Sequence, residues 1–274
     1  MNKILFFLSF ALLSLSCNDD DVAPAQEASD AFVTRISRDG VTALELFYDV
    51  EKKLYRVNYY FSGNLSSYML YEYDENGLKE LRRYDADDHS LNYRTVFTLD
   101  NFGRVIKGEN YSKPDFLDEP ASLSEFEYNG SGQLTVREFR SAGEPVYSRE
   151  EYTYDADGNL IEQQRTHYPN QEEEYLNSIS EYTPRGQPIP GSWENYIFIL
   201  GISGLDYYIR DMFISNFHYK GWGANGTLEF ESTNETSEHV FDEDGNLTAQ
   251  VVTRKNLENP QSPDVVDMTY DYKE

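Results

Sequence analysis

A short motif recurs along most of the chain, and it constrains the fold more than any other feature. It reads aromatic, any residue, aromatic, Asp, any two residues, Gly, and its clearest copy is Tyr152–Leu160. The aspartate, or the residue that replaces it, falls at positions 49, 74, 100, 129, 155, 220, 242 and 271. Most gaps between copies are 22 to 29 residues, and a degenerate copy at Tyr182–Thr183 divides the one gap of 65. The chain is therefore an array of one repeated structural unit.

Each copy of the motif predicts a β-hairpin. Aromatic residues two apart place their side chains on the same face of a strand. The aspartate caps the turn with its side chain, and the glycine takes the left-handed conformation of a type I turn with a bulge. Two strands of about nine residues and two turns account for a period near 26. The turn residues predicted in this way, with a structural role, are Asp74, Gly77, Asp100, Gly103, Asp155, Gly158, Asp242 and Gly245.

The repeats predict the fold class. One hairpin cannot bury enough surface to be stable alone. Eight or nine in series can, because 23 Tyr and 16 Phe residues are available to stack along a common face. We expect an all-β antiparallel meander of hairpins over residues 33–274, curved by strand twist into an open sheet or partial barrel.

Residues 184–216 interrupt the repeats. Several prolines and glycines open this segment, and the most apolar stretch beyond the amino-terminal region follows at Trp193–Phe213. Part of that stretch has apolar residues at helical spacing, which predicts a short helical insert near residues 192–213. Two roles stay open for it: a plug that covers the concave face or an edge of the sheet, and an element that contacts a ligand.

The amino end predicts export. Lys3 precedes a short apolar run, Ile4–Leu15, which is typical of a secretory signal over residues 1–16. The residues Leu13–Cys17 resemble a bacterial lipobox, in which the chain is cut before the cysteine and its thiol is acylated. The resemblance implies that Cys17, the only cysteine, anchors the protein to a membrane, with residues 17–32 as a lipidated acidic linker.

The residues after Cys17 bear on location. The run Asn18–Asp21 is similar to the export signal that sends lipoproteins of Bacteroidetes-type bacteria to the outer face of the outer membrane. The expected location is therefore the outer membrane with the protein facing the cell exterior. The periplasmic face stays open as the alternative.

The repeats themselves resemble a known family. The segments Tyr73–Leu78, Tyr154–Leu160 and Phe241–Leu247 are similar to the YD (RHS-type) repeat, whose core is Tyr-Asp-x-x-Gly-x-Leu. The arrangement resembles the small YD-repeat lipoproteins of Bacteroidetes-type bacteria, a family of unknown function. The resemblance covers roughly residues 44–274. It implies a shell of β-hairpins and carries no activity over to particular residues.

Charge and motifs exclude several functions. The formal net charge of −26 excludes general nucleic-acid binding, which needs a cationic surface. The loops at Asp155 and Asp242 look like calcium loops, but both lack the glutamate that an EF-hand requires at its twelfth position. No nucleotide or nucleophile motif occurs, and acidic pairs such as Glu150–Glu151 are expected on a solvated surface. We expect no metal, no cofactor and no enzymatic activity.

These observations predict a noncatalytic, surface-anchored β-repeat lipoprotein that binds a ligand or interacts with the cell envelope. The ligand stays open between a glycan and a protein. Trp193 and Trp222 are the candidate ligand-contacting aromatic residues. One alternative is a glycan-binding accessory lipoprotein. A second is a secreted hydrolase, which would need a cleft with facing carboxylates.

Overall fold

The computed structural model describes residues 32–112, 119–168, 175–184, 214–244, 246–256 and 263–273. This part of the chain contains sixteen β-strands and no helix. The strands are β1 (Phe32–Arg38), β2 (Val41–Tyr48), β3 (Leu54–Phe61), β4 (Asn64–Asp74), β5 (Gly77–Asp85), β6 (Leu91–Leu99), β7 (Val105–Ser112), β8 (Ser122–Tyr128), β9 (Leu134–Ser141), β10 (Val146–Tyr154), β11 (Leu160–His167), β12 (Tyr175–Pro184), β13 (Ile214–Trp222), β14 (Leu228–Phe241), β15 (Leu247–Asn256) and β16 (Asp264–Lys273).

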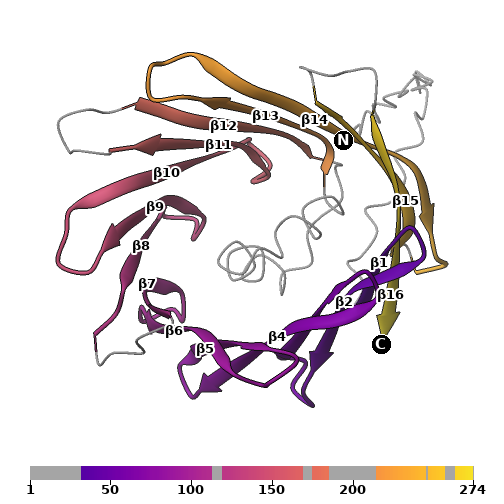
Figure 1. Cartoon of the computed structure of the whole chain (residues 1–274), viewed down its shortest axis with the longest axis horizontal. Helices are drawn as coiled ribbons and strands as arrows, with labels where there is room; N and C mark the ends of the chain where they lie inside the picture. The colour runs from indigo at the N-terminus through magenta and orange to yellow at the C-terminus, as the bar shows by residue number, and fades with distance from the viewer. Residues whose placement is uncertain are drawn as a thin grey trace, which may run out of the picture.

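The strands form an antiparallel meander that closes into a barrel. The strands follow one another around the barrel in chain order, and β1 lies beside β16 (Figure 1). In the pairing of β1 with β16, Ile36 lies opposite Tyr270. The all-β meander is therefore confirmed, but the predicted open sheet or partial barrel is wrong. Closure pairs the two edge strands, which would otherwise expose unpaired backbone groups to solvent and to other chains.

The strands on either side of the interruption in the repeats are neighbours in the barrel. The predicted helix near residues 192–213 lies outside the described residues. The strands that flank it, β12 and β13, pair directly with each other, with Ile179 opposite Lys220. The barrel wall therefore continues across the interruption of the repeat.

Aspartate side chains accept backbone N–H groups in the turns that the motif marks. The Oδ1 atom of Asp100 accepts the backbone N–H groups of Phe102 at 2.8 Å and Arg104 at 2.9 Å. Gly103 has a φ of +79°, in the left-handed region that glycine tolerates best. Because the strands alternate in direction, the turns after β2, β4, β6, β8, β10 and β14 share one end of the barrel. We call this end the Asp-turn rim, and β1 begins there.

In four repeats the tyrosine directly before the turn residue bonds to the preceding strand, and Tyr272 near the end of β16 makes the same kind of bond. Each hydroxyl donates to the carbonyl oxygen of an apolar residue 15 to 25 positions earlier in the chain, at 2.8–3.0 Å. The bonds run from Tyr48 to Val33, Tyr73 to Leu54, Tyr128 to Val105, Tyr154 to Leu134 and Tyr272 to Leu247. The repeated tyrosine therefore ties neighbouring hairpins together, which a single hairpin cannot do for itself.

Alternation along the strands gives the barrel two faces. Leu46, Val57 and Met69 lie opposite one another on β2, β3 and β4, and all three are buried. Their face is the inward one, because a barrel shields side chains from water on its inside. The hydrophobic core lies here, and its buried members come from β1–β8, β15 and β16.

The inward face of β9–β12 carries several buried polar side chains in place of a continuous apolar core. Its buried side chains include Ser148, Glu150, Ser178 and Ser180. The expectation that Glu150–Glu151 lies on a solvated surface is therefore wrong for Glu150, which is 1% exposed. Glu151 points outward, because consecutive residues of a strand face opposite sides.

The outward face is charged all around the barrel. Arg35 on β1, for example, pairs with Glu45 on β2 at 3.2 Å and with Asp271 on β16 at 3.4 Å. The register places at least one charged side chain outward on each strand. In order from β1 to β16, one example per strand is Arg35, Glu45, Arg56, Glu72, Glu80, Arg94, Glu109, Glu125, Glu138, Arg149, Glu162, Glu181, Lys220, Glu231, Lys255 and Asp271.

Candidate binding site

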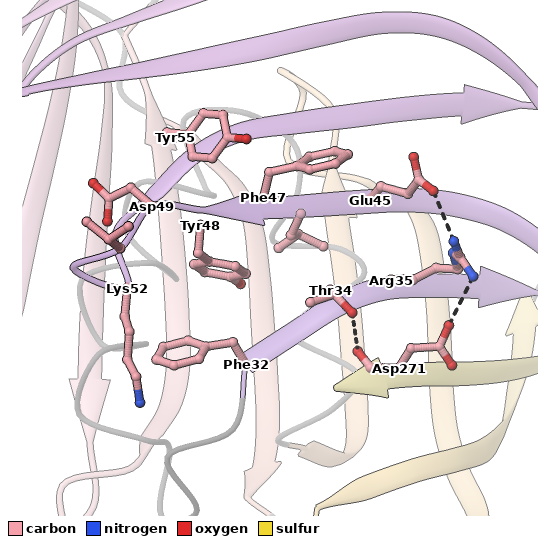
Figure 2. A pocket seen from close by; sticks show the side chains of 12 residues that line it. Phe32, Thr34, Arg35, Glu45, Phe47, Tyr48, Asp49, Lys52, Tyr55 and Asp271 are labelled. Atoms are coloured by element: carbon pink, nitrogen blue, oxygen red, sulfur yellow. Dashed lines mark hydrogen bonds and ion pairs between the residues drawn. The ribbon is translucent and has the colours of Figure 1, made fainter. Parts of the chain in front are cut away.

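A groove of about 600 Å³ lies beside β1, β2 and the β2–β3 turn, close to the Asp-turn rim (Figure 2). We call it the β1–β3 groove. Aromatic and charged side chains line it together. The lining residues are Phe32, Thr34, Arg35, Glu45, Leu46, Phe47, Tyr48, Asp49, Val50, Lys52, Tyr55 and Asp271.

Two pairs of aromatic rings form the apolar part of this groove. The ring centroids of Phe32 and Tyr48 are 5.1 Å apart, and those of Phe47 and Tyr55 are 6.4 Å apart. Tyr55 is the extra residue of a β-bulge, since Phe47 and Tyr48 lie opposite Arg56 and Leu54. Bulges redirect side chains, and this one leaves Tyr55 42% exposed. The groove therefore offers flat apolar surfaces that water can reach.

An ion-paired group forms the polar end of the groove. The Arg35 guanidinium lies between the carboxylates of Glu45 and Asp271 (Figure 2). Glu45 also accepts hydrogen bonds from the Tyr60 hydroxyl and, at 3.4 Å, from the Asn58 amide. The bond from Tyr60 contributes most to holding the pKa of Glu45 below its usual value of 4.5. The polar groups are therefore held in place before any ligand arrives.

This arrangement suits binding better than acid catalysis. Because its pKa is lowered, Glu45 is ionised at neutral pH and has no proton to donate. Aromatic faces beside fixed, planar polar groups can hold a ring that carries hydroxyl groups. Among the described residues, no group of three or more His, Cys, Asp or Glu side chains is placed to hold a metal ion.

The predicted turn residues do not gather into a binding site. Asp74, Asp100, Asp155 and Asp242 each accept backbone N–H groups within their own turns around the Asp-turn rim. Gly77, Gly103 and Gly158 all have positive φ angles. Gly245 lies outside the described residues. Their predicted structural role is consistent with this geometry.

The other predicted residues lie away from the groove. Cys17 and Trp193 fall outside the described residues. Trp222 is half-buried at the end of β13, on the rim opposite the Asp turns, and does not line the β1–β3 groove. The part of the chain that the structure describes holds no helix long and apolar enough to cross a membrane.

Sequence reasoning missed the residues that form the groove. Arg35 and Phe47 share it because β1 pairs with β2 in one particular register, and Asp271 joins them because β16 closes the barrel. The one local signal is the bulge at Tyr55. A bulge of this kind recurs in several repeats, shortly after the turn glycine or the residue that replaces it. The groove itself depends on pairing between residues far apart in the sequence.

Comparisons with known proteins bear on the fold alone. No protein-family model matches the chain, and no curated protein is significantly similar to it. A porin-like protein from Bacteroides uniformis ATCC 8492 has a similar structure, with a TM-score of 0.53, 14% identity and coverage of 88% of this chain and 96% of that chain. A porin-like protein from Bacteroides vulgatus ATCC 8482 aligns with a TM-score of 0.51 and 11% identity, over 89% of this chain and 99% of that chain. The chain thus has the barrel fold of these porin-like proteins.

Proposed function

We propose that the protein is a noncatalytic binding barrel, tied to the outer membrane by a lipid on Cys17 and standing in the water beside the bilayer. The observation that carries this proposal is the charged outward face, which includes all sixteen strands. A barrel that spans a bilayer needs an apolar outward band, and each Arg or Lys at the bilayer midplane costs about 2–4 kcal/mol. Side chains such as Arg82 and Arg149 sit in the middle of their strands.

The porin-like fold is compatible with this proposal, because one fold supports several functions. Ion pairs within and between strands stabilise many of the outward charges in water. Arg82 lies 3.0 Å from Glu72 and 2.7 Å from Glu80, and Arg149 lies 2.8 Å from Glu138. These side chains are partly exposed, and in lipid they would lose the hydration that makes such pairs tolerable.

The topology supports attachment at the Asp-turn rim. The first described residue, Phe32, begins β1 at this rim. The fifteen peptide steps from Cys17 to Phe32 can span at most about 50 Å. The lipid would therefore hold the Asp-turn rim, and the groove beside it, within that distance of the membrane. The acidic run after Cys17 favours the outer face over the periplasmic face.

Fractionation tests the proposal. Residues 1–17 are replaced by a cleavable signal without a lipidated cysteine, and the intact lipoprotein serves as the control. The barrel released from its lipid should appear in the soluble fraction, whereas the control should take up labelled fatty acid and sediment with membranes. A lipid-free barrel that stays in the membrane after alkaline and urea washes would contradict the proposal.

Glycan binding is the second candidate function, and the β1–β3 groove favours it. Exposed rings beside ordered polar groups suit the apolar and hydroxyl faces of a sugar. The test is a glycan array with the intact protein, a Phe47→Ala/Tyr55→Ala variant and a Phe230→Ala control. Phe230 is as exposed as Tyr55 but lies on β14, away from the groove. Glycan binding at this groove would be contradicted if the Phe47→Ala/Tyr55→Ala variant still bound the array, or if the intact protein bound no glycan.

A further inference from the structure

Two arginines and one glutamate lie close together on the inward face of β9, β10 and β11. Glu150 on β10 lies directly opposite Arg137 on β9 and Arg165 on β11. Glu150 is 1% exposed, whereas the Arg165 side chain is 43% exposed. Solvent therefore reaches this cluster from the side of Arg165.

The carboxylate of Glu150 is committed to two other groups. Its Oε1 atom accepts a hydrogen bond from the Nε atom of Arg165 at 2.9 Å. Its Oε2 atom accepts one from the Tyr152 hydroxyl at 2.7 Å. The nearest approach of Arg137 to it is 3.8 Å, from Nη1 to Oε2, which is too long for a hydrogen bond.

Arg137 is held in place by aromatic rings, and one of its N–H donors has no acceptor among the described residues. Its guanidinium carbon lies 4.3 Å from the ring centroid of Phe139 and 5.5 Å from that of Phe126. Its Nε atom is buried and has no acceptor among the described residues. Arginine stays charged at all accessible pH values, so this guanidinium is a fixed cation, and its side chain is 11% exposed.

The charges of the cluster do not cancel. Two guanidinium groups face one carboxylate, which leaves one positive charge on an inward face of a chain whose net charge is −26. Interactions between charges are stronger in a partly desolvated site than on the surface. The geometry of an arginine suits a carboxylate, which it can bind with two parallel hydrogen bonds.

A row of rings lies next to the cluster, towards the rim opposite the Asp turns. Phe139, Tyr147, His167 and Tyr175 follow one another across β9–β12, with centroids 6.5, 6.0 and 5.7 Å apart. Phe139 and His167 are each two positions from the arginine on their own strand, so both point inward. Tyr147 is 38% exposed, so part of the row is open to contact.

We propose that Arg137, Arg165 and this ring row form an inward-facing seat for a carboxylate carried on a ring, such as that of a uronic acid. The guanidinium charge of Arg137 attracts the carboxylate, Arg165 adds charge from the solvent side, and the rings contact the body of the ligand. The proposal rests on the proposed function in one respect, namely that the barrel binds a ligand without transforming it.

The test is calorimetric titration of the purified mature lipoprotein in detergent. Galacturonate is the probe, and galactose is its neutral counterpart. Galacturonate should bind saturably, with galactose at least about tenfold weaker, as expected when a charged hydrogen bond is lost. Arg137→Gln should weaken galacturonate binding at least about tenfold, and Arg137→Lys should restore only part of the affinity because lysine lacks the planar fork.

Arg94→Gln is the matched control. Arg94 also has a buried Nε atom without an acceptor, and its guanidinium lies 4.2 Å from the Tyr111 ring, but it points outward. Its replacement should leave binding unchanged. If Arg137→Gln fails to fold, the comparison of galacturonate with galactose on the unmutated protein decides. Equal affinities for the two sugars would overturn the inference. Phosphate binding as tight as that of galacturonate would overturn the role of the rings. These outcomes do not depend on where the barrel resides in the cell.

Discussion

The tyrosine that links neighbouring hairpins gives the sharpest test of how the repeats cooperate. In Tyr128→Phe the ring stays, and with it the contact to the Arg104 guanidinium at 4.7 Å. Only the hydroxyl is lost, and with it the 2.8 Å hydrogen bond to the carbonyl oxygen of Val105 on β7. Burial raises the pKa of Tyr128, so the hydroxyl keeps its proton at neutral pH and can donate it in a hydrogen bond.

The structure sets the size of the effect. A neutral intramolecular hydrogen bond contributes about 1 kcal/mol net, and a carbonyl left without a donor or water costs about 1–3 kcal/mol. Tyr128 is half-buried, but Val105 is only 5% exposed, so we take the net value of a neutral hydrogen bond as the minimum effect. We expect Tyr128→Phe to lower the free energy of unfolding by about 1 kcal/mol, which is about 2–4 °C in Tm for a chain of this size.

The assay is chemical and thermal unfolding followed by circular dichroism. Tyr55→Phe is the control, because its hydroxyl has no partner among the described residues and its ring is exposed. It should shift Tm by less than about 1 °C. The triple variant with Tyr73→Phe and Tyr272→Phe should lose about 3 kcal/mol, because the three sites are far apart and their effects add.

Two results would refute the reasoning. If Tyr128→Phe shifts Tm no more than Tyr55→Phe, the hydroxyl does not stabilise the junction between hairpins. If the triple variant loses no more stability than one single variant, the junctions are not independent, and the description of the barrel as tied unit by unit is wrong.

Three further predictions concern single sites, each measured by denaturant unfolding. Gly158 has a φ of +89°, so Gly158→Ala should lower the free energy of unfolding by about 1 kcal/mol. Lys52 has a φ of +65°, so Lys52→Gly should raise the free energy of unfolding by about 0.5–1 kcal/mol. If both variants change stability in the same direction, the turn geometry is contradicted. Glu150→Ala should cost about 3–5 kcal/mol by leaving buried arginine charge unpaired, against less than about 0.5 kcal/mol for the outward Glu151→Ala, and similar costs would argue against the inward cluster. The hydrogen bond from the Asn159 side chain lowers the pKa of Asp155 below its usual value of 3.8, so the ionised carboxylate stabilises the fold above pH 3.8. This stabilisation is lost as the pH falls through the lowered pKa. Asp155→Asn should therefore make the free energy of unfolding depend less on pH in acid, and an unchanged dependence would contradict the role of Asp155.

The local unit of this fold could be predicted from the sequence. The Asp and Gly positions of the motif predict turns such as Asp100–Gly103, because an Asp side chain and a left-handed Gly act within a few residues of each other. The antiparallel meander follows from turns too short to allow parallel strands. The family resemblance and the lipid anchor on Cys17 stay predictions.

The candidate site could not be predicted in the same way. Glu150 and Glu151 are adjacent and chemically identical, yet one is buried between arginines and the other lies outside. Which of two alternating faces becomes the inside depends on how all sixteen strands curve together. The β1–β3 groove likewise needs Asp271 beside Arg35, two residues at opposite ends of the domain.

The primary structure alone determined the repeating hairpin, because each turn and each alternating strand is built by contacts between near neighbours in the chain. The tertiary structure decided that the meander closes, which charges lie inside and where aromatic rings meet an ion pair. These depend on the pairing of β1 with β16, more than 200 residues apart, and on a curvature that accumulates over every strand between them.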